Sequence, residues 1–88
     1  MTADDLLTLH PDILFRKVDD EGIIVDQRQP EVMVINSQAL RILELIRETG
    51  SRQELLTRLS AEYETNPATL AADVDEFLLQ LRERDMLI

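Results

Sequence analysis

The spacing of apolar residues changes at Asn36 and divides the chain into a β half and an α half. Before Asn36, three short runs rich in β-branched residues predict strands at residues 13–18, 23–25 and 32–35. The connections between them are short turns, and two short connections between three short strands indicate an antiparallel meander. Gly22 is expected to supply a positive φ in the first turn.

After Asn36, apolar residues recur at helical spacing in three successive segments. Asn36 or Ser37 is the expected N-cap of the first helix, and Gly50 its expected C-terminal stop. Residues 51–54 have the S-x-x-E pattern of a capping box, which predicts the start of the second helix. Asn and Pro at positions 66–67 predict an N-cap followed by the first residue of the third helix.

Three strands followed by three helices predict an α+β domain of the winged-helix type, because a three-stranded sheet needs helices to cover one face. A chain of 88 residues has room for one small domain. We expect this single winged-helix-like domain to span residues 13–88. Residues 1–12, which Pro11 interrupts, are expected to form a flexible N-terminal segment.

Composition excludes several classes of function. The chain has 18 acidic and 9 basic residues, a net charge of −9, which disfavours binding to nucleic acid phosphates. It has no cysteine and a single histidine, so thiolate or multi-histidine metal sites and cysteine nucleophiles are excluded. We find no catalytic set and expect no enzyme activity, no metal and no cofactor. Without a signal peptide or an apolar run of membrane-spanning length, a cytoplasmic location is expected.

Two features remain as candidate recognition surfaces. The third strand is apolar at every position and lies at a sheet edge, where a partner strand could pair with it. Coverage of both its faces within the protein would give the same pattern. The third helix carries Asp73, Phe77, Gln80 and Arg84 on the flank of its apolar stripe, where an aromatic beside polar groups could line a groove. A purely structural Phe77 in the core is the alternative.

The segment VMVINSQALRILELI resembles the strand–Asn–helix signature of the PqqD-like peptide chaperones, also called RiPP recognition elements. The later segment LLTRLSAEYETNPATLAADVDEFLLQLRERDMLI is similar to the closing pattern of the same family, and ILFRKVDDEGIIVD fits its first hairpin. The resemblance covers residues 11–88. It departs from the family at Asp85, where a glycine is frequent, and at Thr49, where Asp precedes the glycine in many members.

The resemblance implies a function in peptide maturation. Family members bind the leader of a ribosomally made precursor peptide as an added strand and present it to a modifying enzyme. That enzyme is a radical-SAM enzyme in the pyrroloquinoline quinone (PQQ) system and a leader peptidase in lasso-peptide systems. The peptide-binding residues that it implies here are Val32, Met33, Val34, Ile35, Asp73, Phe77 and Gln80. Whether Met33 or Val34 would offer its N–H to the leader depends on strand register.

Two other functions fit the same order of elements. One is a winged-helix transcriptional regulator, although residues 67–85 hold five acidic residues against two arginines, which a DNA groove would repel. The other is a small structural subunit that dimerises through its edge strand.

Overall fold

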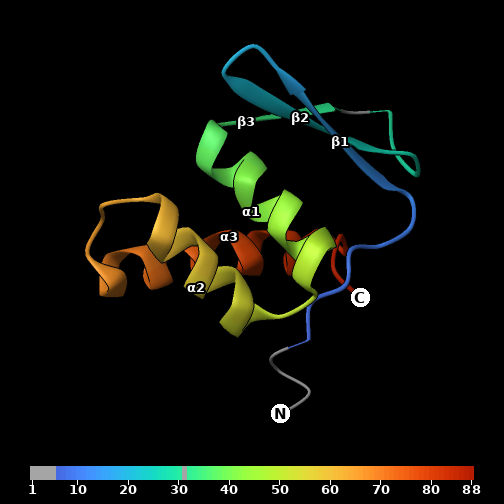
Figure 1. Ribbon diagram of the computed structural model, residues 1–88. Coiled ribbons are helices and arrows are strands. Elements are labelled where there is room, and N and C mark those ends of the chain that lie inside the picture. The colour runs from blue at the N-terminus through green and yellow to red at the C-terminus, as the bar shows by residue number, and fades with distance from the viewer. Residues whose placement is uncertain (1–5, 31) are drawn as a thin grey trace.

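Three strands and three helices follow one another along the chain in a computed structural model that describes residues 6–30 and 32–88 (Figure 1). The strands form one antiparallel sheet in the order β1-β2-β3. This arrangement confirms the predicted α+β class. The elements are β1 (Ile13–Val18), β2 (Glu21–Asp26), β3 (Val32–Ile35), α1 (Ser37–Thr49), α2 (Arg52–Glu62) and α3 (Pro67–Glu83).

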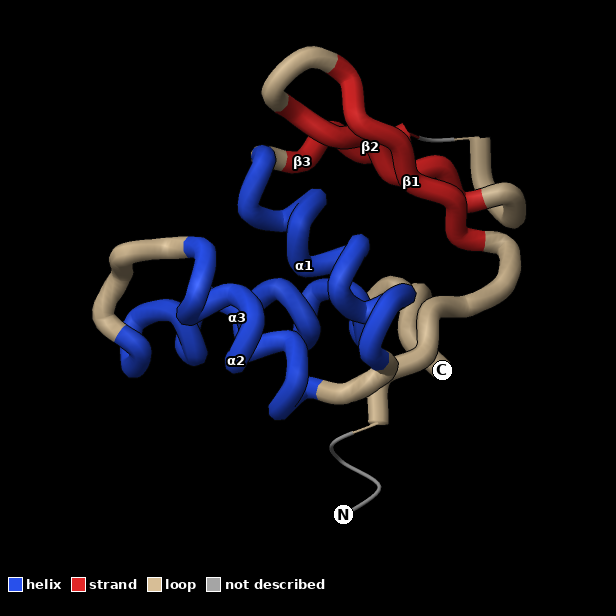
Figure 2. Tube along the Cα trace, in the orientation of Figure 1, coloured by secondary structure: helices blue, strands red, loops and turns tan. Residues whose placement is uncertain are grey.

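The sheet covers one side of α1, and α2 and α3 lie on the other side of that helix (Figure 2). Ile13, Ile24 and Ile35 point from the sheet into the core, where each is less than a tenth exposed. They meet leucines and isoleucines of α1, and the buried stripes of α2 and α3 complete the core. No described helix is long and apolar enough to cross a membrane.

Local capping sets the ends of the helices, as the sequence predicts. The side chains of Asn36, Ser51 and Asn66 each accept a backbone N–H from the first turn of the helix that follows, at 2.8, 3.2 and 2.8 Å. Gly50 ends α1 with a φ of 63°, a left-handed conformation that costs glycine little. These caps satisfy backbone donors and acceptors that a helix end leaves unpaired.

Gly22 has a different role from the one predicted. The left-handed residue of the first hairpin turn is Asp19, with a φ of 54°, and Gly22 lies inside β2. A Cβ atom at Gly22 would lie 3.0 Å from both Ile35 Cγ1 and Leu40 Cδ1. The prediction of a positive φ at Gly22 is therefore wrong, and the glycine instead allows β2, β3 and α1 to approach closely.

The N-terminal segment contacts the domain over the part that the structure describes. Leu7 is 3% exposed, and its N–H donates to the Gly50 carbonyl at 2.9 Å. The His10 N–H donates to the Met86 carbonyl at 2.8 Å. Residues 6–12 therefore pack on the domain. The burial of Leu7 and the backbone hydrogen bonds offset the conformational entropy that these residues lose when they become ordered. The earlier residues of the predicted flexible segment lie outside the described part.

Candidate functional site

The backbone of β3 has an open edge, and the sheet register shows which of its residues use it. Antiparallel strands alternate between residue pairs that exchange hydrogen bonds and pairs that do not. The Gln27 N–H donates to the Asp12 carbonyl at 2.9 Å, and a two-residue turn pairs Val18 with Glu21. Both observations place the odd-numbered residues of β2 in hydrogen-bonded pairs with β1.

The even-numbered residues of β2 therefore direct their N–H and C=O groups toward β3. There Ile24 pairs with Met33, and Gly22 pairs with Ile35. The N–H and C=O groups of the two remaining residues of β3, Val32 and Val34, then point away from β2 to the open edge, where no described strand pairs with them. The edge offers two donors and two acceptors to an added strand.

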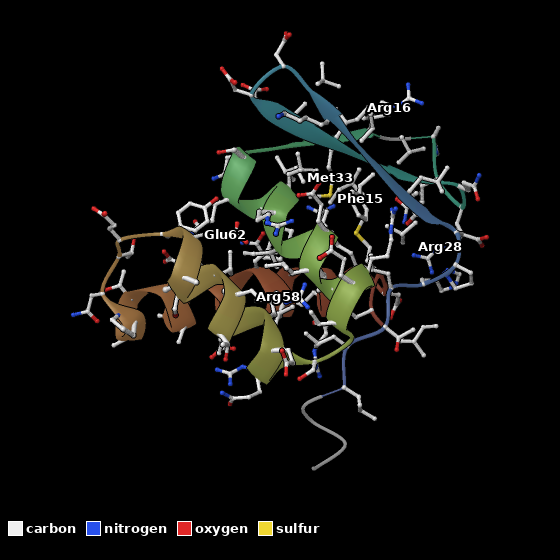
Figure 3. The ribbon with its side chains drawn as sticks, viewed as in Figure 1. Phe15, Arg16, Arg28, Met33, Arg58 and Glu62 are labelled. Carbon is white, nitrogen blue, oxygen red and sulfur yellow. The ribbon has the colours of Figure 1, made fainter. Side chains whose placement is uncertain are left out.

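The side chains of β3 alternate between the two faces of the sheet. Met33 points toward the helices (Figure 3), and Ile35 is buried on the same side. Val32 and Val34 point to the outer face and are 55% and 68% exposed. The alternative that the protein itself covers both faces of this strand is therefore wrong.

A groove of about 410 Å³ lies beside the open edge, between β3, the start of α1 and the middle of α3. Its apolar residues are Met33, Val34, Ile35, Ala39, Ile42 and Phe77. Its polar lining includes Asn36, Gln38, Asp73, Glu76 and Gln80. An extended peptide paired with β3 would therefore have α3 on its other side.

Six of the seven predicted peptide-binding residues line this groove, and Val32 lies on the same strand without lining it. Phe77 is half-buried and contacts the core as well as the groove, so the two alternatives for this residue both hold. The contribution of α1 was missed. Ala39 and Ile42 have the helical spacing of core residues, and the sequence gives no sign that the same face also reaches a groove.

Two acidic side chains give the groove its charge. Asp73 and Glu76 lie one turn apart on α3, are exposed and form no ion pair with a described residue. No lysine or arginine is among the lining residues that the structure describes. The groove therefore combines an apolar floor with a negatively charged rim.

Ion pairs join α2 to the two helices that line the groove. Arg41 of α1 donates from Nε and Nη2 to the Glu62 carboxylate of α2, both at 2.8 Å. Arg52 of α2 donates to the Asp75 carboxylate of α3 at 2.8 and 2.9 Å. The hydrogen bonds from these arginines lower the pKa of Glu62 and of Asp75. Asp75 is thus used for helix packing, whereas Asp73 and Glu76 remain available to a ligand.

A further contact joins the sheet to the end of α3. Asp26 is buried, and its carboxylate accepts hydrogen bonds from Nε and Nη2 of Arg28 at 2.9 and 3.0 Å. The same Nη2 donates to the Asp85 carbonyl at 3.0 Å. These hydrogen bonds lower the pKa of Asp26. Because Arg28 lies between β2 and β3 and Asp85 follows α3, this contact joins the β2–β3 turn to the end of α3.

Among the described residues, no group of three or more histidines or carboxylates is placed to hold a metal ion. The site consists of an edge strand and a groove, an arrangement that suits binding of an extended peptide.

Comparisons with known proteins agree with the fold and identify the family. Two solved structures each match with a TM-score of 0.80. One is TbiB1 in complex with the TbiA(beta) leader peptide, at 22% identity over 90% of this chain and 92% of that chain. The other is lasso peptide synthetase B1 complexed with the leader peptide, at 23% identity over 93% and 96%. No curated protein matches the chain. The family model described as coenzyme PQQ synthesis protein D (PqqD) matches residues 21–87, and the chain therefore belongs to the PqqD family.

Proposed function

We propose that the chain binds the leader region of a ribosomally made precursor peptide as an added strand on β3. It then presents that peptide to a modifying enzyme or a leader peptidase. The observation that carries this proposal is the open edge of β3 beside a groove that α3 closes. The two solved structures of the same fold support it, because both proteins are in complex with a leader peptide.

Backbone pairing alone gives this complex little affinity. Val32 and Val34 supply one donor and one acceptor each, and a hydrogen bond contributes a net ~0.5–1.5 kcal/mol, or about 2–6 kcal/mol for four. Ordering a disordered leader costs ~2–5 kcal/mol. These two contributions nearly cancel. Apolar side chains of the leader, at roughly 25 cal/mol per Å² buried, must therefore supply much of the binding free energy.

The groove defines the side chains that a leader should present. Alternate residues of an added strand face the same side, so residues two apart reach the apolar floor at Met33, Ile35 and Phe77. Asp73 and Glu76 favour a lysine or arginine in the same segment, through electrostatic complementarity. A leader with two apolar residues in alternate positions and a nearby basic residue fits both features.

Binding is the whole of the proposed activity. The described residues include no nucleophile paired with a base, so we propose that this protein alone leaves the precursor chemically unchanged. Mass spectrometry of the precursor after incubation with the protein checks this. No observation favours the transcriptional regulator, whose recognition helix would be the acidic α3.

The test is a fluorescence anisotropy titration of a labelled leader peptide, taken from a precursor identified by a search of the gene neighbourhood, with its scrambled sequence as control. We expect saturable binding of the leader and none of the scrambled peptide. Equal binding of both peptides, or no binding of either, would contradict leader recognition. Binding of a labelled DNA duplex at ~50 mM salt would instead support the regulator.

A further inference from the structure

The face of the sheet that points away from the helices is apolar and uncovered. No described element lies over it in Figures 1 and 2. Its two complete cross-strand rows are Leu14–Val25–Val32 and Arg16–Ile23–Val34, and Val18 with Glu21 follows at the hairpin end. We call these eight residues the outer face. Four of its aliphatic side chains are exposed: Leu14 by 48%, Val18 by 45%, Val32 by 55% and Val34 by 68%.

An exposed face of this composition is unusual for an antiparallel sheet. Such sheets bury one face and present polar side chains on the other. Here six of the eight outward positions are aliphatic. The preference of residues for β-strands does not explain these aliphatic side chains, because threonine also favours strands and would add less apolar surface. A contiguous exposed apolar patch marks a surface that contacts another molecule.

The charges favour a different protein over a second copy. Each chain has a net charge of −9, so two copies stacked face to face repel one another. Arg16 lies on the outer face, on the side away from the helices (Figure 3), and forms no ion pair with a described residue. An apolar surface that carries a carboxylate opposite Arg16 would complement this face.

The outer face is continuous with the proposed leader site. Val34 takes part in both, because its side chain belongs to the outer face and its backbone belongs to the open edge. A leader strand added to β3 would extend the sheet and place alternate side chains beside Val32 and Val34 on this face. A protein seated there would contact the chain and its bound leader together.

We infer that the outer face is the docking surface for the enzyme that modifies or cleaves the leader-bearing precursor, and that this enzyme presents apolar side chains with a carboxylate that pairs with Arg16. The inference rests on the proposed function. Because the enzyme contacts the bound leader, leader and enzyme should strengthen each other's binding by the same factor.

The experiment uses the full chain, the synthetic leader and the maturation enzyme identified by the same search of the gene neighbourhood. Leu14→Glu and Arg16→Glu alter the outer face on β1, two strands away from the open edge. Leu79→Glu is the matched control, because Leu79 is 56% exposed on α3 and does not line the groove. Calorimetry measures the Kd of each variant for the leader, and for the enzyme with and without leader.

We expect both β1 variants to bind the leader within about twofold of the wild type and to bind the enzyme at least tenfold more weakly. The control should match the wild type in both measurements. Leader binding also reports whether each variant is folded. If Leu14→Glu does not fold, Arg16→Glu still tests the outer face, because it replaces one exposed charged residue by another.

Normal enzyme binding by both variants would overturn the docking surface while leaving leader recognition intact. A concentration-dependent dimer that Leu14→Glu dissociates in sedimentation would also overturn it, in favour of a second copy. Absence of leader binding by the wild type would refute the proposed function itself. Failure of the docking surface and failure of the proposed function are therefore distinguishable.

Discussion

Proline substitutions at two adjacent residues of β3 should impair two different properties of the protein, leader binding in one variant and folding in the other. Proline lacks an N–H, so it removes one hydrogen bond wherever it replaces a donor. The register directs the Val34 N–H to the open edge and the Met33 N–H to Ile24 of β2. Val34→Pro should therefore impair leader binding, and Met33→Pro should impair folding.

The expected magnitudes follow from the groups left unpaired. In Val34→Pro, one leader carbonyl loses its donor at a cost of about 1–3 kcal/mol, which weakens the leader Kd about 5- to 150-fold. In Met33→Pro, the Ile24 carbonyl loses its donor inside the sheet and a half-buried side chain loses contacts, for about 2–4 kcal/mol of unfolding free energy. In a domain of this size, each kcal/mol shifts Tm by about 4–8 °C.

Leader anisotropy and thermal melting followed by circular dichroism separate the two effects. Val34→Ala is the control, because it keeps the N–H and shortens a side chain that is 68% exposed. It should bind the leader within about threefold of the wild type. If Val34→Pro melts normally and binds the leader with an unchanged Kd, strand addition to β3 is wrong. If Met33→Pro keeps its Tm, the Met33 N–H is not used within the sheet and the assignment of the open-edge donors is wrong.

Three further substitutions, the first with a control variant, test the groove, the Asp26–Arg28 ion pair and the packing of the sheet. Phe77→Ala should weaken leader binding by about 1–3 kcal/mol through lost apolar contact, whereas Leu79→Ala, outside the groove, should change the leader Kd less than twofold in the same titration. The pKa of Asp26 is lowered by hydrogen bonds from Arg28, so its ionised form favours the folded state. That contribution is complete above the unfolded pKa of about 4 and is lost as pH falls through the lower folded value. Urea unfolding between pH 7 and pH 2 should show this loss, and Asp26→Asn should be less stable than the wild type at pH 7 and lose less stability on acidification. Gly22→Ala should lower the unfolding free energy by about 1–3 kcal/mol, because a Cβ at this position would lie 3.0 Å from neighbouring side chains. An unchanged midpoint of urea unfolding would contradict this, because it would show that those side chains move aside without cost.

Much of the candidate site can be predicted from the sequence, because its parts have local signatures. The helical spacing around Phe77 places Asp73 and Gln80 on the same flank of α3, and the structure finds all three along the groove. The contribution of α1 could not be predicted in this way. Ala39 and Ile42 have the apolar spacing of core residues, and they line the groove because three elements meet at that point.

The sequence alone determined the order of the elements and the ends of the helices. Asn36, Ser51 and Asn66 cap helices through hydrogen bonds to residues two or three positions away, and Gly50 ends α1 through its own backbone conformation. Interactions over so few residues depend on the local sequence, so local patterns predict them.

The tertiary structure decided which groups of β3 face a ligand. In residues 32–35 both alternate sets of side chains are apolar, so polar–apolar alternation cannot distinguish the buried face from the exposed one. The same strand could direct either Met33 or Val34 to the open edge. Pairing with β2, whose own register is set by the turn after Val18, fixes Met33 against Ile24 and leaves Val34 at the edge. Pairing between strands therefore decided what the local sequence left open, because the direction of each N–H depends on the neighbouring strand.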